Sequence, residues 1–200
     1  MKSLLLVGLA LVLQTSSLQA STITYTFMGI ASGALNGTPF TNQQVTLVGV
    51  ADTANITTAG GFPFMPLTSE TVSVASIGGD TITSAMSIAF LGVQSAAIGN
   101  RSGAATLAAI FYPGGLTGYD LVSSFGPVAG QFAFGTGNNG TTVTTTLGSF
   151  NIAGAPGGAG SITFSAVLRT SSAPEPASFG MITLGLMGMA AALGRSRSKS

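Results

Sequence analysis

Hydrophobic and polar residues alternate along most of the middle of the chain. In the stretch STITYTFMGI, the apolar side chains of Ile23, Tyr25 and Phe27 are separated by threonines. Successive side chains of a β-strand point to opposite faces, so this period of two places the apolar groups on one face and the hydroxyls on the other. Further stretches with strand-forming Thr, Val, Ile and Phe are QQVTLVGVAD, ETVSVASI, DTITSAMSIAF, GAATLAAIFY, GTTVTTTLGSFNIAG and GSITFSAVLRT. The pattern therefore predicts an all-β domain.

Turn-forming residues separate these stretches. Asn36-Gly37 is a pair favoured in two-residue hairpins, and glycine pairs stand at 60–61, 78–79 and 114–115. Outside the two ends of the chain, the long apolar period that marks a helix is missing. About nine to eleven short strands divided by glycine-rich turns are typical of an antiparallel β-sandwich or jelly-roll-like domain, which we place at residues 21–173.

The first twenty residues follow a different pattern. Lys2 is followed by an apolar run at 4–13 and by a short polar stretch that ends in Ala20. The apolar run is too short to span a bilayer, which takes about 20 residues. A basic start, a short apolar run and a small residue at the end are the order found in secretory signal peptides. We therefore expect residues 1–20 to be a signal peptide that is cleaved between Ala20 and Ser21.

A second apolar segment lies near the other end of the chain. Residues 177–193 carry no charge, and a helix of this length reaches about 26 Å, just enough to cross the hydrocarbon core of a bilayer. The tail at 194–200 follows and contains Arg195, Arg197 and Lys199. Basic residues next to a membrane span favour the cytoplasmic side. The pattern predicts a C-terminal transmembrane helix with the preceding domain on the far side of the membrane.

The tripeptide Pro174, Glu175 and Pro176 stands at the outer boundary of this segment. Its prolines fix the backbone and remove amide donors, so we expect an exposed, extended stretch that an enzyme at the membrane face can reach. Tripeptide, apolar span and basic tail together resemble the PEP-CTERM sorting signal over residues 174–200, although serines separate the basic residues of RSRSKS and the family usually has a more compact run. The resemblance implies processing by a membrane-embedded exosortase, which cleaves near the tripeptide and releases or transfers the upstream domain.

Charge is scarce throughout the chain. Only 6% of the residues are charged, against roughly 25% in a typical soluble domain, while 46% are apolar. Residues 21–173 contain two basic and four acidic side chains, which gives 2 − 4 = −2, and they contain no lysine. Without a basic patch to neutralise phosphates, nucleic-acid binding is not expected. The chain has no Cys and no His, which excludes thiol nucleophiles, His-based triads and zinc sites built on these ligands.

One glycine motif matches a cofactor-binding spacing. Gly135, Gly137 and Gly140 in GTGNNG have the spacing of a dinucleotide-binding loop. That motif works only where a helix follows, because the pyrophosphate sits at the helix N-terminus. The stretch that follows is TTVTTT, which favours a strand. We therefore interpret the motif as a turn and expect no cofactor.

The acidic residues of the domain are the remaining candidates for chemistry. Glycoside hydrolysis needs two carboxyl groups about 5 to 9.5 Å apart. Asp52 and Asp80 stand beside turn-forming residues, where Asp is favoured for local backbone hydrogen bonds. We expect no catalytic residue, no cofactor and no metal among the four acids, which are Asp52, Glu70, Asp80 and Asp120.

These observations predict an exported, exosortase-sorted, non-enzymatic protein of the cell envelope or extracellular matrix. By family resemblance, this route accompanies exopolysaccharide and biofilm production, so a structural or adhesive role is expected. Hydroxyl-rich, charge-poor faces suit contact with neutral polysaccharide or with other copies of the chain, and strand edges without lysine favour self-association. One alternative is a secreted glycan-binding module or glycoside hydrolase, and another is an envelope protein that stays anchored in the membrane.

Overall fold

The computed structural model describes residues 21–59, 62–90, 95–100, 106–112, 114–116, 118–133, 142–154 and 161–169. The predicted signal peptide at 1–20, the tripeptide Pro174 to Pro176, the segment 177–193 and the basic tail lie outside these residues. No helix within the described ranges has the length and apolar character needed to cross a membrane.

The described part of the chain is built almost entirely of β-strands, and every strand pairing in it is antiparallel. The predicted all-β antiparallel class is therefore confirmed. A single 3₁₀ turn, η1, covers Thr53–Asn55. The strands are β1 (Thr22–Leu35), β2 (Thr38–Asp52), β3 (Thr57–Ala59), β4 (Phe62–Val74), β5 (Gly78–Thr81), β6 (Met86–Phe90), β7 (Ser95–Asn100), β8 (Thr106–Phe111), β9 (Phe125–Ala133), β10 (Thr142–Thr144), β11 (Ser149–Gly154) and β12 (Ser161–Arg169).

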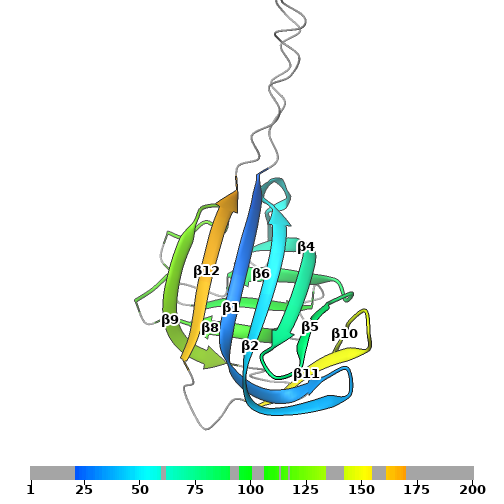
Figure 1. Ribbon diagram of the computed structural model, residues 1–200. Helices are drawn as coiled ribbons and strands as arrows, with labels where there is room; N and C mark the ends of the chain where they lie inside the picture. Colours follow the sequence, from blue (N-terminus) through cyan, green and yellow to red (C-terminus); the bar gives the residue numbers. More distant parts are fainter. Residues whose placement is uncertain are drawn as a thin grey trace, which may run out of the picture. The chain divides into compact units, whose positions relative to one another are not determined.

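Eight of these strands form one sheet that closes on itself as a barrel. The hydrogen-bonded order is β1-β12-β9-β8-β7-β6-β4-β2, and β2 pairs with β1 again. Figure 1 shows β9, β12, β1 and β2 side by side at the front, with β6 and β8 crossing behind them. The structure is a barrel, so the expected two-sheet sandwich is not confirmed. The sequence pattern does not distinguish the two folds, because a sandwich and a barrel both bury one face of each strand and give the same period of two.

Four short strands lie outside the ring. β3 and β5 pair with β4, while β11 pairs with β1 and carries β10 on its other side. Within the described residues, β3, β5 and β10 each pair on one side only. These three strands therefore leave strand edges unpaired, the feature expected to favour self-association.

The β1–β2 hairpin closes the barrel and sets its register. Asn36 and Gly37 form the turn with positive φ angles of 52° and 78°, the conformation that a type I′ turn needs. The predicted hairpin turn is thus confirmed. Pairing runs from Leu35–Thr38 at the turn to Thr22–Asp52 at the far end. At that same end Thr22 also pairs with Arg169 of β12.

Glycine allows the second half of β1 to pair with both β2 and β11. The register of β1 shifts near Gly33 in both pairings. A Cβ atom at Gly33 would lie 2.1 Å from the carbonyl oxygen of Asn151 in β11, so only glycine fits this close approach. The side-chain oxygen of Asn151 also accepts a hydrogen bond of 2.9 Å from the amide of Ala34.

The barrel interior is filled by the apolar positions of the alternating pattern. Ile23, Tyr25 and Phe27 of β1 are all at most 1% exposed, which confirms the face predicted for them. Phe164 of β12 packs against Phe27, with ring centroids 4.9 Å apart. Rings from both strands therefore occupy the centre of the core.

The predicted strand boundaries differ from the observed ones in two ways. β1, β2 and β4 have 13 to 15 residues and are not short strands. The stretch DTITSAMSIAF is interrupted between β5 and β6, where the Ser84 hydroxyl accepts a hydrogen bond from the amide of Thr144 and Ile82 bridges to Thr145. Gly78 and Gly79 belong to β5, so they do not form the expected turn.

We predict that Gly33→Ala lowers the free energy of unfolding by about 1–3 kcal/mol, because its methyl group would force β1 away from β11. Gly154→Ala is the matched control, since a Cβ at that position meets nothing within 4 Å. Urea denaturation of both variants measures the difference. Equal stability of the two would contradict the close approach at Gly33.

Candidate functional site

The four acids from the sequence analysis occupy separate environments. Asp52 begins the η1 turn, and its carboxylate accepts a hydrogen bond of 2.9 Å from the amide of Ala54. Asp120 accepts hydrogen bonds from the amides of Val122 and Ser123, both 2.9 Å, and from the Ser123 hydroxyl at 2.7 Å. Both carboxylates therefore cap local turns, the role that the sequence analysis assigned to Asp52.

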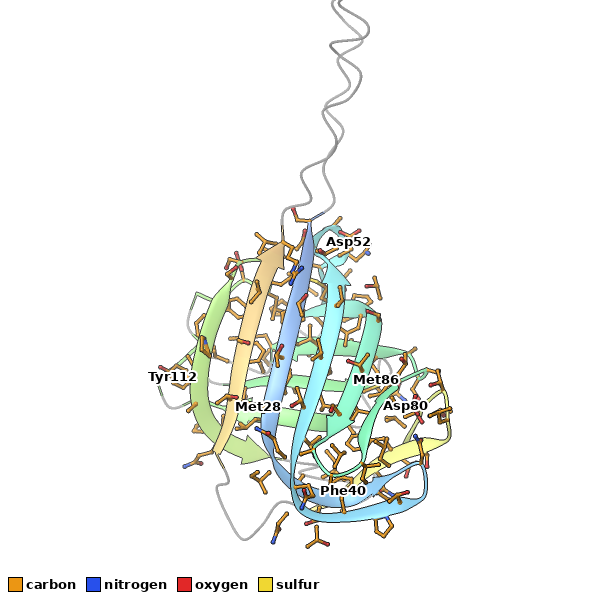
Figure 2. All side chains as sticks on the ribbon, in the orientation of Figure 1. Met28, Phe40, Asp52, Asp80, Met86 and Tyr112 are labelled. Atoms are coloured by element: carbon orange, nitrogen blue, oxygen red, sulfur yellow. The ribbon has the colours of Figure 1, made fainter. Side chains whose placement is uncertain are left out.

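Asp80 lies in β5 and joins three segments that are distant in sequence. Its Oδ1 accepts hydrogen bonds from the amide of Thr81 at 2.7 Å and from the Thr146 hydroxyl. Its Oδ2 accepts from the side-chain amide of Asn36 at 2.8 Å and from the amide of Leu147 at 3.1 Å. The predicted turn position is thus wrong for Asp80, because its partners come from two other turns. Figure 2 labels Asp80 beside β5 and β10.

These hydrogen bonds favour the ionised form of Asp80. The bond from Thr146 is the main cause that lowers the pKa of Asp80 well below its usual range, with further hydrogen bonds from Asn36 and Thr81, while burial opposes them. The side-chain oxygen of Asn36 in turn accepts a hydrogen bond of 2.7 Å from the Thr145 hydroxyl. With its oxygens engaged in this way, Asp80 connects the β1–β2 hairpin to the β10–β11 turn.

Glu70 is the acid whose environment differs most from a turn. It is 3% exposed and points into the barrel with Val72 and Val74 of the same strand. Neither carboxyl oxygen has a hydrogen-bond partner in the part of the chain that the structure describes. Burial raises the pKa of Glu70 from its ordinary value of 4.5 to about 8, so the carboxyl group is neutral at pH 7. In the sequence, the phase of Glu70 with Val72 and Val74 is the signal that identifies it as an inward residue.

The residues around Glu70 in the ladder are small or aromatic. Gly49 of β2 stands directly opposite Glu70, and Tyr25 of β1 stands on the other side of Gly49. The Tyr25 hydroxyl donates a hydrogen bond to the carbonyl oxygen of Leu121, whereas the buried hydroxyl of Tyr119 has no partner among the described residues. Burial raises the pKa of both tyrosines above the usual range.

Glu70 of β4 has acids on both neighbouring strands, Asp80 on β5 and Asp52 at the end of β2. Asp80 pairs with Val72, so it lies on the same face of the β4–β5 pair as Glu70 and two positions along. The hydrogen bonds to Asp80 come from amide and hydroxyl groups, and those described for Asp52 and Asp120 are local. The described geometry therefore uses three of the four carboxylates to fix turns and buries the fourth.

The opposite side of the same strands carries a regular polar surface, which we call the neutral face. It consists of three rows of four outward-facing residues, one each from β12, β1, β2 and β4. The rows are Thr163–Met28–Thr46–Ser73, Ser165–Thr26–Val48–Thr71 and Val167–Thr24–Val50–Ser69.

The neutral face combines hydroxyl and aliphatic groups and contains no charge. Eight of its twelve residues are Ser or Thr, and four are Val or Met. The Thr163 hydroxyl donates a hydrogen bond of 3.4 Å to the carbonyl oxygen of Met28, and the other seven hydroxyls make none to the described protein. The strands that carry the face are adjacent in Figure 1, and Met28 is labelled on it in Figure 2.

Most of the predicted site residues of the terminal signals lie outside the described residues. These are Ala20, Pro174, Glu175, Pro176, Arg195, Arg197 and Lys199. Ser21 is described, and its carbonyl oxygen accepts hydrogen bonds of 3.0 Å from both the amide and the hydroxyl of Thr53. The glycines of GTGNNG also lie outside, whereas the strand expected after them is confirmed as β10, Thr142–Thr144.

We predict that Asp80→Asn lowers the midpoint of thermal unfolding. The side-chain amide in the Asp80→Asn variant has one acceptor oxygen in place of two. Its NH₂ group would therefore face hydrogen-bond donors of the turns that Asp80 now holds, and those donors would lose their acceptor. Since the pKa of Asp80 is lowered on folding, its contribution is present above pH about 4 and is lost as the pH falls further. Asp52→Asn, which affects one hydrogen bond, is the control. If Asp80→Asn is as stable as this control, the hydrogen bonds of Asp80 do not stabilise the turns as proposed.

We predict that Glu70 makes the protein less stable as the pH rises. The unfolded chain releases the Glu70 proton above pH 4.5, whereas the folded protein keeps it until about pH 8. The free energy of unfolding therefore falls between these values, with a limiting slope of about 1.4 kcal/mol per pH unit, and levels off above them. Glu70→Gln should remove this slope, which urea denaturation at a series of pH values measures.

Asp120→Asn is the matched control for this pH series. The pKa of Asp120 is lowered by hydrogen bonds from Ser123 and Val122 against the opposing effect of its partial burial. Its contribution therefore changes only under acidic conditions, and the slope assigned to Glu70 should persist in this variant. A slope that survives Glu70→Gln would show that another group causes it.

Comparison with known proteins adds no relative to this description. A scan against protein-family models finds no matching family, and searches of curated proteins and of solved structures find no match either. The resemblance of residues 174–200 to a sorting signal therefore stays a prediction. The assignment of function depends on the chain's own residues: a closed antiparallel barrel with a buried, unpaired glutamic acid and a neutral outer face.

Proposed function

We propose that this chain is an exported, exosortase-sorted, non-enzymatic protein of the cell surface or extracellular matrix, with a structural or adhesive role. The observation that carries the proposal is the neutral face, because a surface of hydroxyl and methyl groups without charge suits extended contact with uncharged matrix material. Exosortase and the membrane are the partners during sorting. Neutral exopolysaccharide, and other copies of the chain, are the partners afterwards.

The limits of the barrel support the proposed processing at both ends. β1 begins at Thr22, directly after the predicted cleavage between Ala20 and Ser21. β12 ends at Arg169, five positions before Pro174. Removal of a signal peptide and of a C-terminal sorting signal would therefore leave every strand of the barrel intact.

The structural role is also supported by how the acids are used. Asp52, Asp80 and Asp120 accept hydrogen bonds that hold turns, and Glu70 is enclosed among apolar side chains. Their positions fit a rigid module that presents its exterior to the surroundings. The four acids as described do not form an exposed pair of free carboxylates, so their positions give no support to the alternative of a glycoside hydrolase.

We predict that mass spectrometry of the protein recovered outside the producing cells finds Ser21 at the N-terminus and finds no peptide that contains Arg195 to Lys199. Replacing Pro174, Glu175 and Pro176 together by alanine should leave the tail attached and keep the chain in the membrane fraction, because the exosortase would lose its recognition site.

Ser171→Ala with Ser172→Ala is the control, since it changes the adjacent residues and spares the tripeptide. An extracellular protein that still carries the basic tail would overturn the sorting proposal. A wild-type chain that stays in the membrane with its tail attached would show the permanently anchored alternative.

A further inference from the structure

We propose that the neutral face of β12, β1, β2 and β4 binds a neutral polysaccharide chain that lies across the strands. The inference rests on the proposed function and names the surface and the chemical class of its partner.

The distribution of charge favours a neutral partner. None of the twelve residues is ionisable. Beyond the face, the next row places Arg169 and Asp52 on either side of Thr22. These two opposite charges lie at one end of the face and leave its centre without a net field. A polyanion or a polycation would find no complementary charge on the three central rows, whereas an uncharged polymer loses nothing there.

Most of the side-chain hydrogen-bonding capacity of the face is not used by the described protein. Each hydroxyl can donate one hydrogen bond and accept two, and seven of the eight hydroxyls make none to the described protein. Aliphatic side chains stand among them, and Val167 and Met28 are 50% and 37% exposed. Sugar units have the same two kinds of surface, since hydroxyl groups line their edges and C–H groups cover the faces of the ring.

The spacing of the rows fits an extended polymer. Neighbouring strands lie about 4.8 Å apart, which is close to the length of one sugar unit in an extended β-linked chain. A polysaccharide along the row Ser165–Thr26–Val48–Thr71 would therefore place about one sugar unit over each strand. Because the sheet twists from strand to strand, a single flexible chain can follow the row better than a flat crystalline surface can.

The area of the face argues against a second copy of the chain as its main partner. Four strands by three rows cover about 19 Å by 20 Å, or roughly 400 Å², which is half of the approximately 800 Å² that each partner buries in a standard protein–protein interface. A polymer that runs from one molecule to the next does not need a large area on each, because the contacts add along the chain.

The test measures binding of soluble polysaccharides to the immobilised protein, purified as the producing cells release it, by biolayer interferometry. The probes are a neutral mixed-linkage β-glucan and hydroxyethyl cellulose, with alginate as the charged counterpart. Thr26→Lys with Thr71→Lys places two cations on either side of Val48 in the central row. Thr58→Lys with Thr144→Lys adds the same charges on exposed strand positions away from the face, and serves as the matched control.

We expect the wild type and the control to bind both neutral polymers and not alginate, and the Thr26/Thr71 lysine variant to bind the neutral polymers at least about tenfold more weakly. Thr26→Val with Thr71→Val keeps the shape and charge and removes two hydroxyls, so it should also weaken binding. The unfolding midpoint of the lysine variant shows whether that variant folds. If it does not fold, the valine variant still tests the inference.

Three outcomes would overturn the inference. The first is a wild type that binds neither neutral polymer, the second is equal binding by wild type and both face variants, and the third is binding of alginate as strong as that of the glucan. If sedimentation instead finds oligomers that only the face variants disrupt, the face is a contact between copies. Failure here with correct export and tail removal leaves the proposed export and sorting standing and removes only the polysaccharide partner, whereas failure of export overturns the proposed function whatever the protein binds.

Discussion

The pairing of β1 with β2 is the constraint on which the rest of the structure depends. Without it, the order β1-β12-β9-β8-β7-β6-β4-β2 would describe an open sheet with two free edges. The type I′ turn at Asn36-Gly37 starts this pairing, which ends with Thr22 opposite Asp52, while the pairing of β1 with β12 places Arg169 on the other side of Thr22. The same register aligns the inward side chains of β1 and β2 in the core and their outward side chains in the neutral face.

The alternating pattern was sufficient to assign strands and their faces, but it did not determine how the sheet closes. Ile23, Tyr25 and Phe27 point inward as their period of two predicts. Closure depends on which strands pair, and β1 pairs with residues as distant as 169. Side-chain periodicity carries no information on such contacts. The break between β5 and β6 was missed for the same reason, because it is held by the β10 region.

The candidate sites were predictable to the extent that they are local. Asp52 next to a turn was recognisable from its neighbours, and Glu70 could have been assigned to the interior from its phase with Val72 and Val74. The partners of Asp80 were not recognisable, because Asn36 and Thr146 are separated from it by 44 and 66 positions. Each strand of the neutral face showed its hydroxyls in the sequence, whereas the rows exist only once the register of four strands is known.

The pairing of Thr22 with Arg169 also has a mechanical consequence. The first strand and the last strand of the barrel are neighbours, and the chain enters and leaves at the same end of that pair. Tension applied between the two ends would separate β1 from β12 one residue pair at a time, beginning at Thr22 and Arg169, rather than shear all their hydrogen bonds together. A molecule tethered through a single end carries no such load across this seam, so loss of one tether would protect the barrel from being pulled open.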